Sequence, residues 1–94
     1  MIIGKHLREL REKKGLLLRQ VAASLEVDTA YISKMERGEK SIKREYVLQL
    51  AKIYQANPED LLTLWLTDKI LEIIKDEKTG VSALKMAEAS LIKK

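Results

Sequence analysis

The sequence predicts an all-α protein of 94 residues built from six helices. Two observations predict this class. Apolar residues recur nearly throughout at the three- and four-residue spacing of a helix face, and signals that start or stop helices divide the pattern into segments. Apolar residues make up 46% of the chain but aromatic residues only 4%, so the core is expected to be aliphatic.

The first helix is expected from about Ile3 to Lys14. Its buried stripe is predicted by the spacing of Ile3, Leu7 and Leu10. Gly15 follows this stripe at the position where a glycine commonly ends a helix.

Two short helices joined by a brief turn are expected next, over residues 18–25 and from residue 29 to just before Gly38. Only Glu26 and Val27 separate the first of them from Asp28, whose carboxylate is a good N-terminal cap for the second. The residues expected to face inward are Val21, Ala22, Leu25, Ile32 and Met35. Gly38 and the polar residues 39–41 predict a loop.

Three further helices are expected over the rest of the chain. The fourth spans residues 43–54, with an apolar face of Val47, Leu50, Ala51 and Tyr54. Asn57-Pro58 then starts a fifth helix, whose apolar residues between positions 61 and 74 cover most of its circumference instead of one stripe. Such a helix can serve the core with one face and a partner subunit with another. A sixth amphipathic helix is expected over residues 81–92 after Thr79-Gly80.

The charge of the chain is concentrated in its first part. The net charge is +4, but residues 1–56 hold 12 Lys and Arg against 7 Asp and Glu, a charge of +5, whereas residues 57–94 hold 6 against 7, a charge of −1. A basic part joined to a near-neutral, apolar part is typical of a polyanion-binding module with an assembly element, although many soluble proteins are mildly basic.

Composition argues against an enzyme and against a metal protein. The chain has no Cys and a single His, His6, so thiolate zinc sites, His-paired zinc sites and disulfides are excluded. Neither a second His nor a Gly-rich phosphate loop accompanies His6, and we expect no catalysis, metal or cofactor. The N-terminus becomes charged too early for a signal peptide and no run of 18 apolar residues occurs, so we expect a cytoplasmic, nucleoid-associated protein without a membrane segment.

Residues 15–38 resemble the helix-turn-helix of the Cro and phage-repressor family, also called Xre-type regulators. The resemblance lies in Val21-Ala22, Leu25, Val27 and above all the stretch Tyr31-Ile32-Ser33-Lys34-Met35-Glu36-Arg37-Gly38. It extends over residues 3–11, 47–51 and 59–62, about two-thirds of the chain. The resemblance implies a five-helix lambda-repressor-like DNA-binding domain over residues 1–66. The resemblance does not cover the remaining third, where the apolar residues lead us to expect a dimerisation extension over residues 67–94, made of the end of a long fifth helix and the sixth helix.

In this family the third helix enters the major groove of DNA, which implies roles for particular residues. Base contacts are expected from Thr29, Ala30 and Lys34, although Lys34 taken without the motif would be read as a solvated surface charge. Contacts to the DNA backbone are expected from Arg19, Gln20, Tyr31, Ser33, Arg37, Lys40, Lys43 and Arg44. Two alternatives stay open: Tyr31 could instead brace the third helix, and Lys43 and Arg44 could simply solubilise the fourth.

Glu36 places an acid within a surface meant to approach phosphates, and the resemblance implies that Arg11 neutralises it in a structural ion pair. The chain also departs from the family pattern in three places. Leu17 and Leu18 stand where a Ser or Thr cap and a Gln are usual, and Ile42 replaces a frequent Pro. Glu26 takes the place of the usual Gly in the turn. Either this residue is left-handed and under some strain, or the turn has a slightly different geometry.

These observations together predict a sequence-specific transcriptional repressor that binds a pseudo-palindromic site in double-stranded DNA as a homodimer. The dimer is expected to form through residues 61–92, with contacts from Leu64, Trp65, Leu71, Ile74, Leu84 and Leu91. The alternative is a protein-interaction module, such as an antitoxin or adaptor with a second protein as partner. Within the DNA-binding class, a controller of a restriction–modification system is a further possibility.

Overall fold

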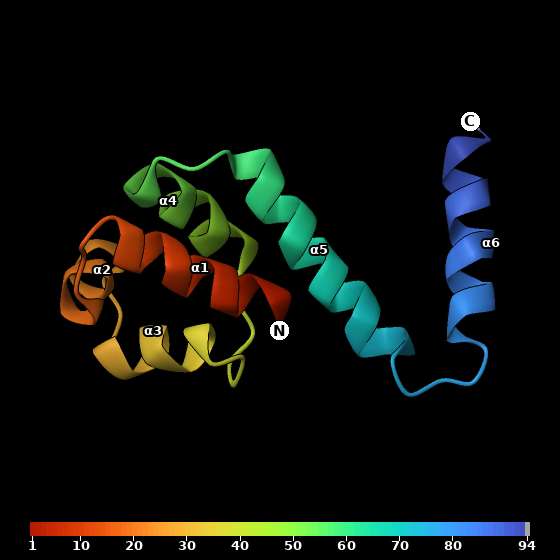
Figure 1. The fold of residues 1–94 in the computed structure, drawn as a ribbon, viewed down its shortest axis with the longest axis horizontal. Coiled ribbons are helices and arrows are strands. Elements are labelled where there is room, and N and C mark those ends of the chain that lie inside the picture. Colours follow the sequence, from red (N-terminus) through yellow and green to blue (C-terminus); the bar gives the residue numbers. More distant parts are fainter. Residues whose placement is uncertain (94) are drawn as a thin grey trace.

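The computed structural model describes residues 1–93, and within them it contains six helices and no strand (Figure 1). The helices are α1 (Ile2–Lys13), α2 (Leu18–Leu25), α3 (Thr29–Glu36), α4 (Arg44–Tyr54), α5 (Pro58–Ile74) and α6 (Gly80–Ile92). Each begins and ends within a residue or two of the expected position. The predicted all-α class is confirmed.

The core lies among α1 to α4 and the first turns of α5. It is aliphatic apart from one tyrosine, as the composition predicts. Its fully buried members are Ile3, Leu7, Val21, Ala22, Leu25, Ile32, Met35, Ile42, Val47, Leu50, Ala51, Tyr54 and Leu61. Each helix of this part therefore contributes its apolar stripe to a single core, and α3 is held by Ile32 and Met35.

Ile42 has a structural role that the sequence pattern did not reveal. It lies in the loop between α3 and α4, its side chain is buried in the core, and its carbonyl oxygen accepts a hydrogen bond of 2.6 Å from Nε1 of Trp65. The isoleucine that stands where the family often has proline therefore anchors the loop. It also ties α5 to the segment that follows α3.

Helix α5 is fixed at its start and again near its middle. At its start, Oδ1 of Asn57 accepts hydrogen bonds from the backbone N–H groups of Glu59 at 2.8 Å and Asp60 at 3.4 Å, as the cap signal predicts. Further along, Asp68 accepts from the first backbone N–H groups of α1, those of Ile2 and Ile3. This contact joins residues more than sixty positions apart and therefore leaves no local signal in the sequence.

Beyond the core, α5 extends outward and α6 stands apart from the rest of the domain (Figure 1). We call residues 66–93 the arm. Within its described residues only Gly80 is buried, and large apolar side chains are exposed. They are Leu66, Ile70, Leu71, Ile73, Val81, Leu84, Met86, Leu91 and Ile92.

The six residues expected at a dimer interface fall into two groups. Leu64 and Trp65 are half-buried against the core of their own chain, and the indole N–H of Trp65 is bonded to Ile42, so both largely serve the domain itself. The other four, which are Leu71, Ile74, Leu84 and Leu91, belong to the arm and are exposed or half-exposed. An apolar groove of about 400 Å³ between α5 and α6 is lined by Ile74, Leu84 and Leu91 among others.

Candidate nucleic-acid interface

The turn between α2 and α3 depends on a residue in the left-handed conformation. Glu26 follows α2 with φ 57° and ψ 45°, and the backbone N–H of Val27 donates to the carbonyl of Ala22 at 3.0 Å. A left-handed residue with a side chain carries strain that glycine would avoid. Of the two alternatives at Glu26, the left-handed residue is the one present.

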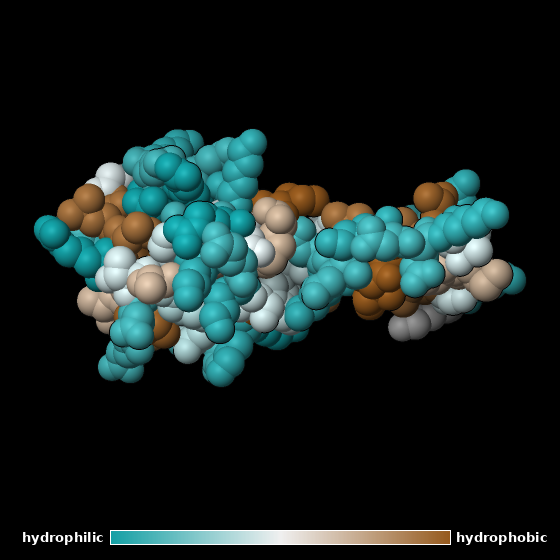
Figure 2. Space-filling model, turned by 90° about the horizontal axis from the view of Figure 1, so that it is seen from below, coloured by the Kyte–Doolittle hydropathy of each residue, from teal (hydrophilic) through white to brown (hydrophobic). Residues whose placement is uncertain are grey.

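Helix α3 lies at the edge of the domain with one face open (Figure 1). Ile32 and Met35 point into the core, whereas Thr29, Ala30 and Lys34 are exposed. Seen from the side of α3, the domain carries many hydrophilic residues beside a few hydrophobic patches, and both kinds of residue are seen on the arm (Figure 2). The helix is 8 residues long, and its exposed polar face is backed by a packed core.

Tyr31 takes the bracing position that the sequence analysis kept as an alternative. Its ring meets that of Tyr46 edge to face, with centroids 5.8 Å apart, and its hydroxyl donates a long hydrogen bond of 3.5 Å to the carbonyl of Ser41. Burial raises the pKa of the Tyr31 hydroxyl above its ordinary value. The side chain holds α3 against α4 and leaves only a partly exposed hydroxyl for other contacts.

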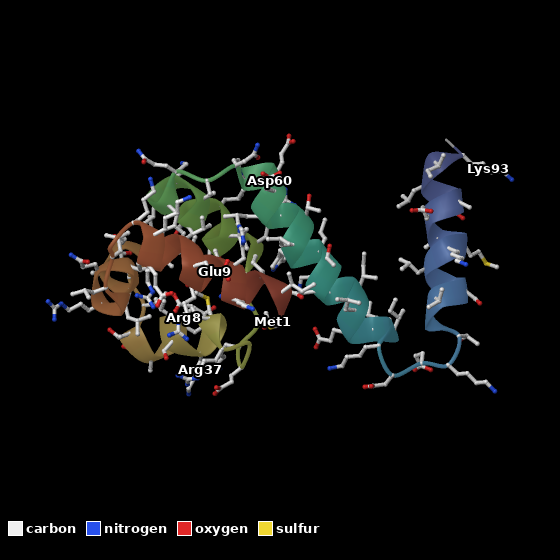
Figure 3. All side chains as sticks on the ribbon, in the orientation of Figure 1. Met1, Arg8, Glu9, Arg37, Asp60 and Lys93 are labelled. Carbon is white, nitrogen blue, oxygen red and sulfur yellow. The ribbon has the colours of Figure 1, made fainter. Side chains whose placement is uncertain are left out.

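The six cations that the sequence analysis assigns to base or backbone contacts are exposed. They are Arg19, Lys34, Arg37, Lys40, Lys43 and Arg44. Arg37 lies at the C-terminal end of α3 and points away from the domain (Figure 3). Its guanidinium is bound at two positions, because Nε donates to Oε2 of Glu39 and Nη1 donates to Oγ of the half-buried Ser33. Ser33 and Arg37 therefore form one unit with Glu39, a residue to which the sequence analysis gave no role.

The start of α2 shows how the chain replaces the missing family cap. Leu17 and Leu18 cannot accept hydrogen bonds through their side chains. Instead Oε1 of Gln20 reaches back and accepts from the backbone N–H of Leu17 at 2.8 Å. Half of a capping box is thus retained, and the Gln20 side chain is engaged within the protein through its oxygen.

In the part of the chain that the structure describes, the starts of α3 and α4 lack side-chain caps, and the cap expected from Asp28 is wrong. Asp28 occupies the cap position of α3, but within residues 1–93 its side chain makes no cap hydrogen bond. Lys43 precedes α4 as its cap residue and is not part of the helix. Both residues are exposed, and the first backbone N–H groups of α3 and α4 lack a side-chain acceptor among the described residues.

The structure contains the ion pair between Arg11 and Glu36 that the resemblance implies. Nε of Arg11 lies 2.8 Å from Oε2 of Glu36, and Nη2 lies 3.1 Å from Oε1, so the pair is bidentate. The two side chains are only 12% and 5% exposed, and Nη1 of Arg11 also donates to the carbonyl of Leu16 at 2.9 Å. The hydrogen bond to Glu36 raises the pKa of Arg11 above its ordinary value.

A close backbone approach at Gly4 adds to this fixation of α3 on α1. A Cβ atom at position 4 would lie 2.5 Å from the carbonyl oxygen of Met35 and 2.8 Å from that of Glu36. Only glycine allows α1 to pass so near the end of α3. The sequence analysis gave Gly4 no role of its own, because a glycine within a helix does not reveal which backbone it approaches.

Residues 1–93 contain no group of three or more His, Cys, Asp or Glu that could hold a metal ion. None of the helices described is long and apolar enough to cross a membrane.

Two helices joined by a tight turn, the second of them exposed and bordered by cations, define a helix-turn-helix domain. Comparison with known proteins agrees: the family described as "Helix-turn-helix domain" matches residues 2–65. The chain belongs to this helix-turn-helix family, in agreement with the Xre-type resemblance.

Two curated relatives are named as regulators. The chain is 36% identical over 62 residues to the HTH-type transcriptional regulator DdrOP3 of Deinococcus deserti, a match that covers 66% of this chain and 48% of the relative. It is 38% identical over 64 residues to the putative HTH-type transcriptional regulatory protein TK0539 of Thermococcus kodakarensis, which covers 65% of this chain and 20% of the relative. The match therefore spans half or less of these relatives' lengths.

One solved structure matches nearly the whole chain. It is that of the clp gene regulator ClgR from Corynebacterium glutamicum, with a TM-score of 0.61 and 27% identity over 97% of this chain and 83% of the other. The fold similarity thus covers the arm as well as the helix-turn-helix.

Proposed function

We propose that this protein is a sequence-specific DNA-binding transcriptional regulator that acts as a repressor in the cytoplasm, at the nucleoid. The observation that carries the proposal is the open face of α3, where Thr29, Ala30 and Lys34 are exposed between cations on a rigidly packed helix. Membership of the helix-turn-helix family and the names of the two curated relatives support it. We propose repression because a dimer bound across a promoter blocks polymerase by occupancy alone.

In this proposal the first turns of α3 lie in the major groove. Lys34 reaches guanine O6 and N7, and the methyl groups of Thr29 and Ala30 pack against thymine methyl groups. Phosphate contacts come from the surrounding polar and basic side chains, which set affinity and register. They are Arg19, Gln20, Tyr31, Ser33, Arg37, Lys40, Lys43 and Arg44.

The arm supplies the proposed homodimer contact. A 13-residue helix such as α6 is only marginally stable alone in water, and its apolar side chains are exposed in the isolated chain. A second copy that covers the groove between α5 and α6 would bury them, and the near-neutral charge of residues 57–94 permits such self-association. Two α3 helices about 34 Å apart would then read a pseudo-palindrome in successive major grooves.

The exposed apolar arm also favours a second candidate function. A different protein with an apolar helix would fit the same groove, as expected for an antitoxin or adaptor. Light scattering on the purified chain separates the two candidates: a stable dimer favours the regulator, whereas a monomer that co-purifies with a stoichiometric second protein favours the interaction module.

The DNA-binding proposal is tested by in vitro selection of duplex sequences, followed by affinity measurements on the selected site. We expect Lys34→Ala to lower the discrimination between guanine and the other bases at one position by about 1–3 kcal/mol, because a bidentate contact to guanine is lost. Arg37→Ala should weaken binding to all sequences. Lys78→Ala, which removes an exposed cation in the arm, is the matched control and should leave affinity nearly unchanged.

Two outcomes would contradict the proposal. If the selection enriches no sequence, the proposal of sequence-specific DNA binding is contradicted. If Lys34→Ala and Arg37→Ala each lower the affinity equally for all duplex sequences, the division between base and phosphate contacts is contradicted.

A further inference from the structure

Glu39 places a carboxylate on the surface that the proposed function assigns to DNA. It lies three residues after the end of α3 and is exposed, and its Oε2 accepts a hydrogen bond from Nε of Arg37. An anion at this position is unexpected, because the neighbouring cations would be placed there to meet phosphates. The acid at Glu36 is neutralised in a nearly buried pair, but Glu39 is on the outside.

The backbone fixes where Glu39 stands. Gly38 adopts φ +77° and turns the chain back at the end of α3. The backbone N–H of Glu39 then donates to the carbonyl of Lys34 at 2.8 Å, which pins residue 39 to the last turn of the helix. The acid therefore belongs to the reading unit and is not carried on a free loop.

The Glu39 carboxylate faces two of the cations proposed to contact DNA. The hydrogen bond from Arg37 holds the pKa of the Glu39 carboxyl below its ordinary value, and the charges of Arg37 and then Lys34 act in the same direction. Arg37 also donates through Nη1 to Ser33. A phosphate oxygen that approaches this guanidinium meets an arginine whose Nε is already occupied by an internal anion.

We propose that Glu39 is an internal competitor for DNA phosphate and thereby weakens binding to duplexes of every sequence. To bind a phosphate fully, Arg37 must give up its hydrogen bond with Glu39, and Glu39 is then left as an uncompensated negative charge beside the DNA backbone. Non-specific binding depends on phosphate contacts alone, so this penalty lowers the affinity for every duplex. Base contacts still distinguish the specific site from other sequences. The inference depends on the proposed DNA binding.

The test compares the full chain with its Glu39→Gln variant on the selected site and on a duplex of unrelated sequence. Removing the competing charge should tighten binding to both duplexes by about threefold to tenfold and steepen the plot of log affinity against log salt by up to about 1. Glu77→Gln removes one negative charge from the loop between α5 and α6 and serves as the matched control, with little change expected.

Arg37→Ala supplies the second arm of the experiment. If Glu39 acts mainly through Arg37, the gain from Glu39→Gln should fall by at least half in the Arg37→Ala background. A circular dichroism melt of each variant verifies that all of them are folded.

Each outcome separates the inference from the proposal on which it rests. Weaker or unchanged binding by a folded Glu39→Gln chain would overturn the inference, because Glu39 would then be a positioning residue for Arg37 or a bystander. If Glu77→Gln tightens DNA binding as much as Glu39→Gln does, the change reflects only the overall charge of the protein, and the inference is overturned. A wild-type chain that binds neither duplex would overturn the proposed function itself.

Discussion

Asp68 caps the first turn of α1 from another helix: its Oδ2 accepts the backbone N–H of Ile3 at 2.8 Å, and its Oδ1 accepts that of Ile2 at 2.8 Å. The first N–H groups of a helix have no partner within the helix, so a carboxylate there satisfies two of them and also meets the positive end of the helix dipole. The contact joins α1 to the first turn of the arm.

Asp68→Ala should therefore lower the free energy of unfolding by about 1 kcal/mol, the usual cost of losing a helix cap. Urea denaturation followed by circular dichroism measures it. Asp76→Ala removes an exposed acid that follows α5 and is the control, with little change expected. A loss no larger than in this control would show that the cap adds nothing to stability.

The nearly buried pair of Arg11 and Glu36 should behave as a unit. Glu36→Gln or Arg11→Met alone should destabilise the protein by about 2–4 kcal/mol, because each leaves a desolvated charge without its partner. The double variant should lose less than the sum of the two single variants. Strictly additive losses in a double-mutant cycle would contradict this coupling.

The buried hydroxyl of Tyr54 should make the protein sensitive to alkali. Burial raises the pKa of Tyr54 above its ordinary value, and the negative charge of Glu36 adds to this while Arg11 opposes it. Above about pH 10 the unfolded chain loses a proton that the folded chain retains, so stability is complete below that pH and falls as the pH rises toward the folded pKa.

Tyr54→Phe removes this hydroxyl. Between about pH 10 and pH 11.5, the free energy of unfolding of the variant should therefore fall less steeply with pH than that of the wild-type chain, by up to about 1.4 kcal/mol per pH unit. Some decline should remain, because burial also raises the pKa of Tyr31. Urea unfolding at a series of pH values measures the slope. An identical slope in the wild-type chain and the variant would exclude Tyr54 as the cause.

The apolar groove of the arm gives a test of the proposed dimer. Leu84→Glu places a charge in the groove between α5 and α6 and should convert a dimer into a monomer by light scattering, with α1 to α4 still folded. Ser82→Glu makes a similar change on the same helix at a residue outside the groove lining and should leave the dimer intact. If the Leu84→Glu variant is still a dimer, the dimer interface lies outside this groove.

Most of the fold could be predicted because its signals are local. The stripe of Ile3 and Leu7, the cap formed by Asn57 and the loop after α3 each depend on a few neighbouring residues. The start of α3 shows the limit of such signals. Asp28 stands at the predicted cap position, yet its carboxylate makes no cap hydrogen bond within the described chain, because position in sequence does not fix a side-chain rotamer.

In the candidate site, too, some features could be predicted from local sequence and others depend on distant residues. The motif from Tyr31 to Gly38 predicted which residues lie on α3, and the structure leaves Lys34 exposed there. Whether Tyr31 braced the helix or stood free could not be decided from the motif, since the answer depends on Tyr46 in α4. Glu39 drew no attention in the sequence because an acid in a polar loop is ordinary until its partners are known.

The sequence by itself determined six helical segments, their inward faces, a tight turn at Glu26 and the family to which residues 15–38 are similar. Tertiary structure alone decided the cap that Asp68 provides for α1, the close approach at Gly4, the anchor between Trp65 and Ile42, and the pairing of Arg37 with Glu39. The physical reason is range: helix periodicity and most capping act within a few residues, whereas these contacts exist only after packing brings separate elements of the chain together.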